Sequence, residues 1–214
     1  APDSKGFKVL LADTVSVRRI LEDLAARGDG GVKLFSGKTR LGGTQAETTV
    51  EELLDDSEFW QGNATFQSYL DANADVLQRE LGLGVDDIVK IPVCFTVKKT
   101  QGILARADAF FPNMVNHLVV DRPSDDGQDV DRLSGVPRPY GPVVDGKCAL
   151  EAAFEAALSG AKLKRRVRFV DDWLPYFTMQ GDVHCGTNAR RTPPESTRWW
   201  HTRPEGGFDI NALE

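Results

Sequence analysis

Short apolar runs rich in β-branched residues alternate along this chain with longer stretches whose apolar residues recur at helical spacing. This alternation limits the fold more than any other feature of the sequence. Strands are predicted over 6–12, 32–35, 88–97, 118–120 and 166–170, and helices over 15–27, 48–54, 63–81 and 148–159. Interleaved strands and helices are typical of α/β domains. The 214 residues suffice for one sizeable domain, and no repeat is visible.

Helix-capping residues and helix-ending glycines refine these boundaries. Asp13 or Thr14 should cap the first helix, and Asn63 or Thr65 the longest one. The longest helix should end at Leu81, before two glycines. An apolar stripe predicts which side chains of this helix enter the core: Phe66, Tyr69, Leu70, Ala74, Leu77 and Leu81. Segment 98–105 should be a turn or hairpin loop, and the acidic segment 121–131 an exposed loop.

The charge balance narrows the choice of partners. A formal net charge of −6 argues against nucleic-acid binding, which needs concentrated Lys and Arg, but suits a cationic substrate. Simple solubility explains the same charge. No apolar run approaches the ~20 residues that cross a bilayer, so no membrane partner is expected. The polar N-terminus without methionine indicates processing or an artificial boundary, and on this basis secretion is favoured over the cytoplasm.

The cysteine content argues against a disulfide scaffold and a zinc site, although a disulfide between Cys94 and Cys148 is an alternative. Cys94, Cys148 and Cys185 are too few for such a scaffold and show no CxxC spacing. Cys94 lies in an apolar run and Cys148 precedes a helical pattern, so both are predicted to be structural. No His, Cys and Asp residues have metal-ligand spacing either.

Cys185 is the candidate catalytic residue. It lies between Gly181 and Gly186, where little side-chain bulk would shield a thiol, and nucleophilic chemistry needs its thiolate. In extended chain, His184 would point to the opposite face, so an activating group should come from elsewhere. His117 and His201 carry no recognisable motif. A buried structural cysteine beside a satisfied histidine is the alternative.

Several segments together resemble the protein-arginine deiminases. The run Val183–Arg191, followed by Trp199-Trp200, is similar to the C-terminal end of that family. Four further segments resemble it in the same order: Lys5-Gly6-Phe7 with Leu10-Leu11-Ala12, Arg79–Leu83, Ala109–Asn116 and Gly135–Val143. Only the acidic run 121–131 and the tail after Trp200 fall outside the resemblance.

The resemblance implies a fold and a chemistry. The fold would be the pentein, with αββαβ blades around a pseudo-fivefold axis; residues 1–202 would form roughly its last two blades and 203–214 a tail. Cys185 would attack the guanidinium carbon of peptidyl-arginine, so the partners would be arginine-containing proteins or peptides. The family's Gly-His-Val-Asp-type motif is absent from this sequence. The histidine and carboxylates should therefore belong to a companion chain, the N-terminal part of the same proteolytically processed precursor. Vertebrate members of the family depend on calcium. The resemblance therefore implies possible calcium binding by the complete enzyme, with ligands outside this chain.

Two other functions compete with this one. The chain could be a catalytically silent structural or regulatory fragment, or a thiol-dependent deiminase of free arginine or agmatine. Residues that bind substrate are not identified. Asp171 and Asp172 are expected at the surface or as capping groups, and Asp182 is expected to tune the cysteine loop. Arg138 and Tyr140 could contact substrate or serve in packing. Lys38 and Arg40 could contact an acidic substrate segment, but a solvated turn is the preferred interpretation.

Overall fold

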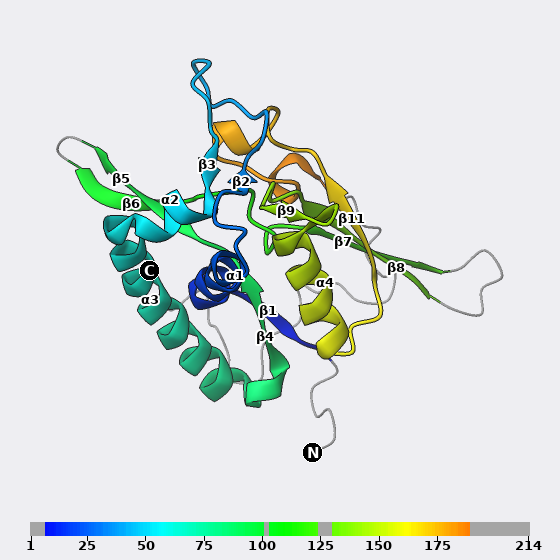
Figure 1. Ribbon diagram of the computed structural model, residues 1–214. Coiled ribbons are helices and arrows are strands. Elements are labelled where there is room, and N and C mark those ends of the chain that lie inside the picture. The colour runs from blue at the N-terminus through cyan, green and yellow to red at the C-terminus, as the bar shows by residue number, and fades with distance from the viewer. Residues whose placement is uncertain (1–6, 101–102, 124–129, 189–214) are drawn as a thin grey trace, which may run out of the picture.

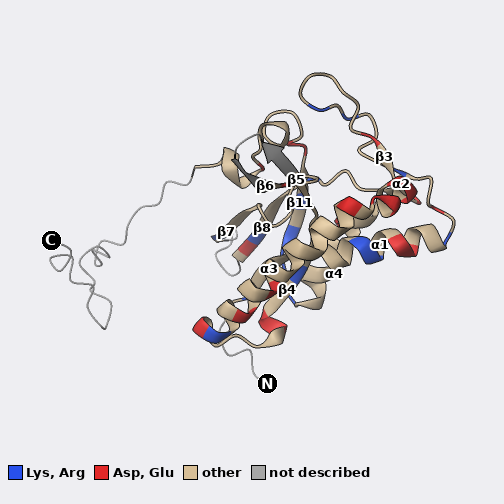
Figure 2. Cartoon of the chain, turned by 90° about the vertical axis from the view of Figure 1, so that its left-hand side faces the viewer, with Lys and Arg blue, Asp and Glu red and all other residues tan. Residues whose placement is uncertain are grey.

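A parallel pair of strands surrounded by helices forms the centre of the molecule. The computed structural model describes residues 7–100, 103–123 and 130–188. Strand β1 (Val9–Asp13) pairs in parallel with β4 (Ile88–Pro92). Helices α1 (Thr14–Ala26), α3 (Ser57–Leu81) and α4 (Ala149–Gly160) pack around this pair, as Figure 1 shows. Figure 2 marks positions of Lys, Arg, Asp and Glu along α1 and α3.

The remaining elements form short sheets at the edge of this centre. Helix α2 (Val50–Asp55) connects β3 (Thr48–Thr49) to α3, and β2 (Lys33–Leu34) pairs with β3. The other strands are β5 (Phe95–Thr100), β6 (Ile103–Ala109), β7 (Leu118–Pro123), β8 (Val130–Pro137), β9 (Val143–Val144), β10 (Lys147–Cys148) and β11 (Arg166–Val170). Strands β5 and β6 form a hairpin, β9 pairs with β10, and β11, β8 and β7 form a three-stranded sheet.

The predicted mixed α/β class is confirmed. Two crossovers join parallel strands through helices, β1 to β4 by way of α1 to α3, and β8 to β11 by way of α4. Within the described residues the strands close into no barrel or propeller. The apolar faces of α1, α4 and β4 bury one continuous core that includes Leu21, Ile91 and Phe154.

Local signals located several elements correctly. The Asp13 carboxylate accepts the backbone N–H of Ser16 and thus caps α1. Thr49 and Glu52 form a reciprocal capping box at the start of α2. Gly82 ends α3 in the left-handed conformation, with φ of 61°, which glycine adopts without strain.

The predicted start of the longest helix is wrong. Helix α3 begins at Ser57, and its cap is Asp56, whose carboxylate accepts the N–H of Phe59. Asn63, predicted as a cap, is buried inside the helix and bonds both backbone groups of Phe95 at the start of β5. The predicted stripe is only partly buried, because Tyr69 and Leu81 are exposed.

One strand prediction and two loop predictions also change. The run 88–97 divides into β4 and β5, because the chain turns at Val93 and Cys94, both fully buried. Residues 98–100 and 103–105 extend the β5–β6 hairpin and do not form a loop. At the ends of the acidic segment, 121–123 and 130–131 pair within β7 and β8, while 124–129 lie outside the described residues. Cross-strand hydrogen bonds of this kind leave no local sequence signature.

Candidate active site

Cys185 lies in a tight turn after the last strand. β11 ends at Val170, and the chain then forms short 3-10 turns at Phe177–Met179 and His184–Gly186. The expectation of extended chain at Cys185 is therefore wrong, and alternation does not orient its neighbours. Cys185 is exposed, whereas Cys94 is buried and Cys148 partly buried, as predicted for structural cysteines. Desolvation raises the pKa of both the Cys94 and the Cys148 thiols, which makes them poor nucleophiles at neutral pH.

The two glycines around Cys185 permit close approach within the protein. A Cβ on Gly181 would lie 3.3 Å from Cys185 Cβ. A Cβ on Gly186 would lie 2.4 Å from Cζ of Tyr176, far inside van der Waals contact. Glycine at both positions therefore lets the turn fold tightly against its own preceding segment.

Asn116 connects the sulfur of Cys185 to a buried carboxylate. Its Nδ2 donates to Cys185 Sγ at 3.1 Å and to Asp182 Oδ2 at 3.3 Å. The backbone N–H of Asn113 donates to Asp182 Oδ1 at 3.2 Å, and the N–H of His184 donates to the Asn116 carbonyl at 3.3 Å. The loop after β6 and the loop after β11 thus hold each other, and the expectation that Asp182 tunes the cysteine loop has a structural basis.

Asp172 contradicts the expectation of a surface or capping group. Its side chain is 1% exposed, and neither carboxylate oxygen accepts a hydrogen bond from the residues that the structure describes. Burial, reinforced by the nearby negative charge of Asp182, raises the pKa of Asp172 to about 7. Burial likewise raises the pKa of Asp182 to about 6, although hydrogen bonds from Asn116 and Asn113 oppose this rise. Asp171 behaves as predicted and pairs with Lys38 at the surface.

No histidine ring within the described chain hydrogen-bonds to Cys185. His117 is partly buried, its Nδ1 lies 2.9 Å from the carbonyl oxygen of Met114, and its ring lies edge-on to Phe154 of α4. Desolvation lowers the pKa of His117, which favours the neutral imidazole. His184 is exposed beside Cys185, and His201 lies outside the described residues, as do Trp199 and Trp200.

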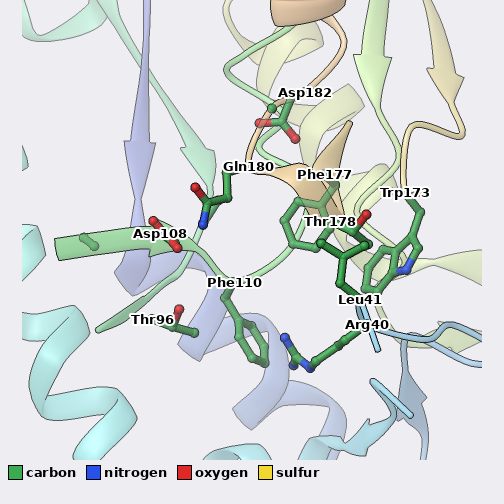
Figure 3. A pocket seen from close by; sticks show the side chains of 13 residues that line it. Arg40, Leu41, Thr96, Asp108, Phe110, Trp173, Phe177, Thr178, Gln180 and Asp182 are labelled. Carbon is green, nitrogen blue, oxygen red and sulfur yellow. The ribbon is translucent and has the colours of Figure 1, made fainter. Parts of the chain in front are cut away.

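A cavity of about 490 Å³ adjoins the cysteine turn (Figure 3). Three parts of the chain form it: the loop between β2 and β3, the β5–β6 hairpin with Phe110, and the segment from Trp173 to Asp182. Two residues of its wall connect it to the cysteine turn: Asp182 accepts a hydrogen bond from Asn116, which also donates to Cys185 Sγ, and Gly181 lies next to Cys185 Cβ. A mixed apolar and polar cavity beside an exposed thiol is typical of a small-molecule or side-chain binding site.

Arg138 and Tyr140 are engaged within the chain, which agrees with their packing interpretation. Arg138 pairs with Glu151 at 3.1 Å. Tyr140 packs edge-on against Trp173, and the ammonium of Lys38 lies 3.9 Å from the centroid of the Tyr140 ring. These contacts attach the rigid proline-rich segment to the base of the cavity.

The described residues do not form a calcium site. They contain no group of three or more His, Cys, Asp and Glu side chains arranged to hold a metal ion. Asp172 and Asp182 supply only two carboxylates, whereas calcium takes six to eight oxygen ligands. Across the described part of the chain, no helix has the length and hydropathy of a membrane span.

Sequence reasoning missed Asn116 and the burial of Asp172. Asn116 lies in the Ala109–Asn116 segment that carried the family resemblance, but no spacing rule connects it to a cysteine 69 positions later. Asp171 and Asp172 are adjacent and chemically identical, so only the tertiary structure decides which one is buried.

Comparisons with known proteins identify the family of this chain. The family model for protein-arginine deiminase matches residues 1–201. The chain is 37% identical over 205 residues to protein-arginine deiminase type-3 of Rattus norvegicus, covering 95% of this chain and 28% of that protein. It is 36% identical to type-4 of Mus musculus, over 95% of the chain and 28% of the relative, and 36% identical to type-1 of Homo sapiens, over 94% and 27%. The chain belongs to the protein-arginine deiminase family and spans little more than a quarter of the length of these relatives.

Proposed function

We propose that this chain is the C-terminal part of a protein-arginine deiminase catalytic domain and that Cys185 is its nucleophile. The observation that carries the proposal is the position of Cys185, an exposed thiol bonded to Asn116 beside a cavity, in a chain of this family. Proteins or peptides that contain arginine are the proposed substrates, and peptidyl-citrulline and ammonia the products.

The reaction proceeds in two steps through a covalent intermediate. The Cys185 thiolate adds to the guanidinium carbon, which forms a C–S bond and a tetrahedral adduct. Ammonia leaves with a proton from a general acid, and an S-alkyl thiouronium remains on the sulfur. Water, deprotonated by the same group acting as base, adds to this carbon. The C–S bond then breaks, which releases citrulline and returns the thiol.

This chain's own residues contribute the sulfur and its support. Asn116 Nδ2 donates to Sγ and therefore orients the sulfur and stabilises negative charge on it. Asp182 in turn holds the Asn116 amide. A guanidinium is planar and permanently charged, so carboxylates must bind it and an acid must protonate the leaving ammonia. We assign these groups to the family's Gly-His-Val-Asp-type motif, carried by an upstream companion chain of the same precursor.

The pentein arrangement belongs to this proposal. The two strand–helix–strand crossovers support two blade-like units, and the loops after β6 and β11 would then meet at the hub of the complete domain. Unpaired sheet edges and the exposed Tyr69 and Val97 would face the companion chain. Calcium, where the complete enzyme needs it, would bind to residues outside this chain.

Citrulline formation from an acetylated, amidated arginine peptide tests the proposal on the complete protein. The Cys185→Ala variant should lose all activity, while the control Cys148→Ala retains it. Activity that survives Cys185→Ala refutes the nucleophile. Equal activity on free arginine or agmatine would favour a small-molecule deiminase. Inactivity of the complete protein would favour a silent fragment, a function that the missing histidine motif of this chain also supports. A denaturing gel with intact-mass analysis tests for the companion chain.

A further inference from the structure

We propose that Arg40 binds a carboxylate that accompanies the target arginine, so that the cavity beside Cys185 selects arginines with an acidic neighbour. This inference rests on the proposed function and names the class of substrate. Arg40 lines the cavity together with Leu41, both from the loop between β2 and β3. The solvated-turn interpretation of this loop therefore fits only part of it, because Arg40 contributes to a cavity wall.

The backbone around Arg40 is held in place from both sides. The preceding Lys38 pairs with Asp171 at 3.2 Å, and Trp173 Nε1 donates to the carbonyl of Thr39 at 2.7 Å. The N–H of Arg40 donates to the carbonyl of Thr44 at 2.7 Å, which closes a tight turn. A guanidinium on such an anchored backbone loses less entropy on binding than one on a free loop.

The guanidinium of Arg40 has no acidic partner among the described residues. Lys38, two positions earlier, is already paired, and the ion pairs of the described chain do not include Arg40. The protein as a whole carries a formal net charge of −6, so carboxylates are plentiful elsewhere on its surface. An unpaired arginine in a cavity of such a protein is available to a ligand.

The cavity wall carries charges of both signs: the Arg40 guanidinium and two carboxylates, Asp108 and Asp182. In Figure 3, Arg40 lies beside Phe110 at one end, and Asp182 lies at the other end, next in the chain to the cysteine turn. Phe177 and Leu41 provide apolar wall between the two ends. A substrate placed with its target arginine toward Cys185 would bring a neighbouring carboxylate toward Arg40. This arrangement matches a zwitterionic segment better than a uniformly cationic one.

The carboxylate could come from either of two sources. One is an aspartate or glutamate side chain adjacent to the target arginine in a peptide, which family membership favours. The other is the α-carboxylate of a C-terminal or free arginine. Both present the same planar anion to the guanidinium, and the experiment must separate them.

Binding can be measured without turnover by calorimetry on the complete protein carrying Cys185→Ala. The probes are the neutral peptide Ac-Gly-Gly-Arg-Gly-Gly-NH₂, versions with Glu or Lys beside the arginine, Ac-Gly-Gly-Arg with a free carboxylate, and free arginine. We expect a Glu-containing peptide to bind about three- to tenfold more tightly than the neutral peptide, and the preference to weaken in high salt. Tighter binding confined to the free-carboxylate probes would assign the α-carboxylate as the source.

Variants at Arg40 decide the proposal. Arg40→Gln should abolish the preference for the carboxylate, and Arg40→Glu should reverse it toward the Lys peptide. Arg19→Gln, which removes the same charge from the exposed face of α1, should leave the preference unchanged. Arg40 is exposed, so circular dichroism should show that each variant folds.

Three results would overturn the proposal: no preference in the parent protein, the same preference after Arg40→Gln, or no binding of any probe. The outcome is independent of catalysis. A protein that binds with this preference but forms no citrulline would refute the proposed function alone, whereas equal binding of all probes by an active enzyme would refute this inference alone.

Discussion

Replacing Asp172 with asparagine should stabilise the protein more at alkaline pH than at acidic pH. The Asp172 carboxylate is 1% exposed and has no hydrogen-bond donor among the described residues. Its pKa is raised from 3.8 to about 7. Folding therefore raises the affinity of this group for a proton, and ionisation of the folded state costs free energy that the unfolded state does not lose.

The difference between the folded and unfolded pKa of Asp172 gives the sign and the size of the effect on stability. As pH rises above 3.8 the unfolded state releases the proton first, so the folded state loses stability until the pH passes about 7. Each pKa unit corresponds to about 1.36 kcal/mol, so the full cost is ~4 kcal/mol. About 2–3 kcal/mol of this cost should accumulate between pH 5 and pH 8. Asparagine cannot ionise, so Asp172→Asn removes the pH-dependent part.

Urea unfolding at pH 5 and pH 8, followed by circular dichroism under reducing conditions, measures the effect. The gain in unfolding free energy of Asp172→Asn over the parent should be larger at pH 8 by about 2–3 kcal/mol. Asp171→Asn is the matched control: Asp171 is adjacent, exposed and paired with Lys38, and the pKa of Asp171 is lowered by its hydrogen bonds. That substitution should cost a little stability at pH 8. An equal effect of Asp172→Asn at both pH values would refute the argument.

Two further substitutions test the hydrogen bonds of single asparagines. Asn116→Leu should slow the alkylation of Cys185 by iodoacetamide about tenfold, because the sulfur loses its amide donor. The control Asn113→Ala should react at the parent rate, because the Asn113 side chain does not reach Cys185. Equal rates in the parent and both variants would contradict the role of this hydrogen bond. Asn63→Leu should lower the free energy of unfolding by about 2–4 kcal/mol, because it leaves a buried N–H and a C=O of β5 without partners. Asn73 is exposed on the same helix, so the control Asn73→Leu should lower it by less than about 1 kcal/mol in the same urea titration. Similar losses in both variants would refute the role of the Asn63 hydrogen bonds.

The sequence predicted those parts of the fold that depend on neighbours along the chain. Helices α1 and α4 and strand β11 carry their own periodicity, and the capping box of Thr49 and Glu52 is a local pattern. The start of α3 was missed because Asn63 resembles a cap in sequence. Its amide instead serves the backbone of β5, a partner 32 positions away. A polar residue buried for a distant partner has no local signature.

For the candidate site, the sequence predicted the cysteine but not the residues that support it. Cys185 stands between two glycines within a segment that resembles the family, so the sequence alone identifies it as the candidate. Its support was not visible, because Asn116 approaches from another loop and the 3-10 turn replaces the extended chain that alternation assumed. The sequence alone does not distinguish Arg40 from Lys38, the other basic residue of its loop. The structure separates them, since Lys38 is paired and Arg40 lines the cavity.

The carboxylates near Cys185 are poorly placed to bind a guanidinium directly. The substrate-binding carboxylates of the proposed reaction should therefore be other residues. Asp182 uses one oxygen for the N–H of Asn113 and the other for the amide of Asn116, and Asp172 is enclosed beneath the turn. Binding a guanidinium there would break the bonds that hold the sulfur in place. Asp182 supports the sulfur of Cys185 through Asn116, so under the proposed function other carboxylates must neutralise the substrate. The internal geometry of this chain is thus consistent with the proposed function, in which this chain supplies the sulfur and its support, and the substrate carboxylates and the acid–base group lie outside the described residues.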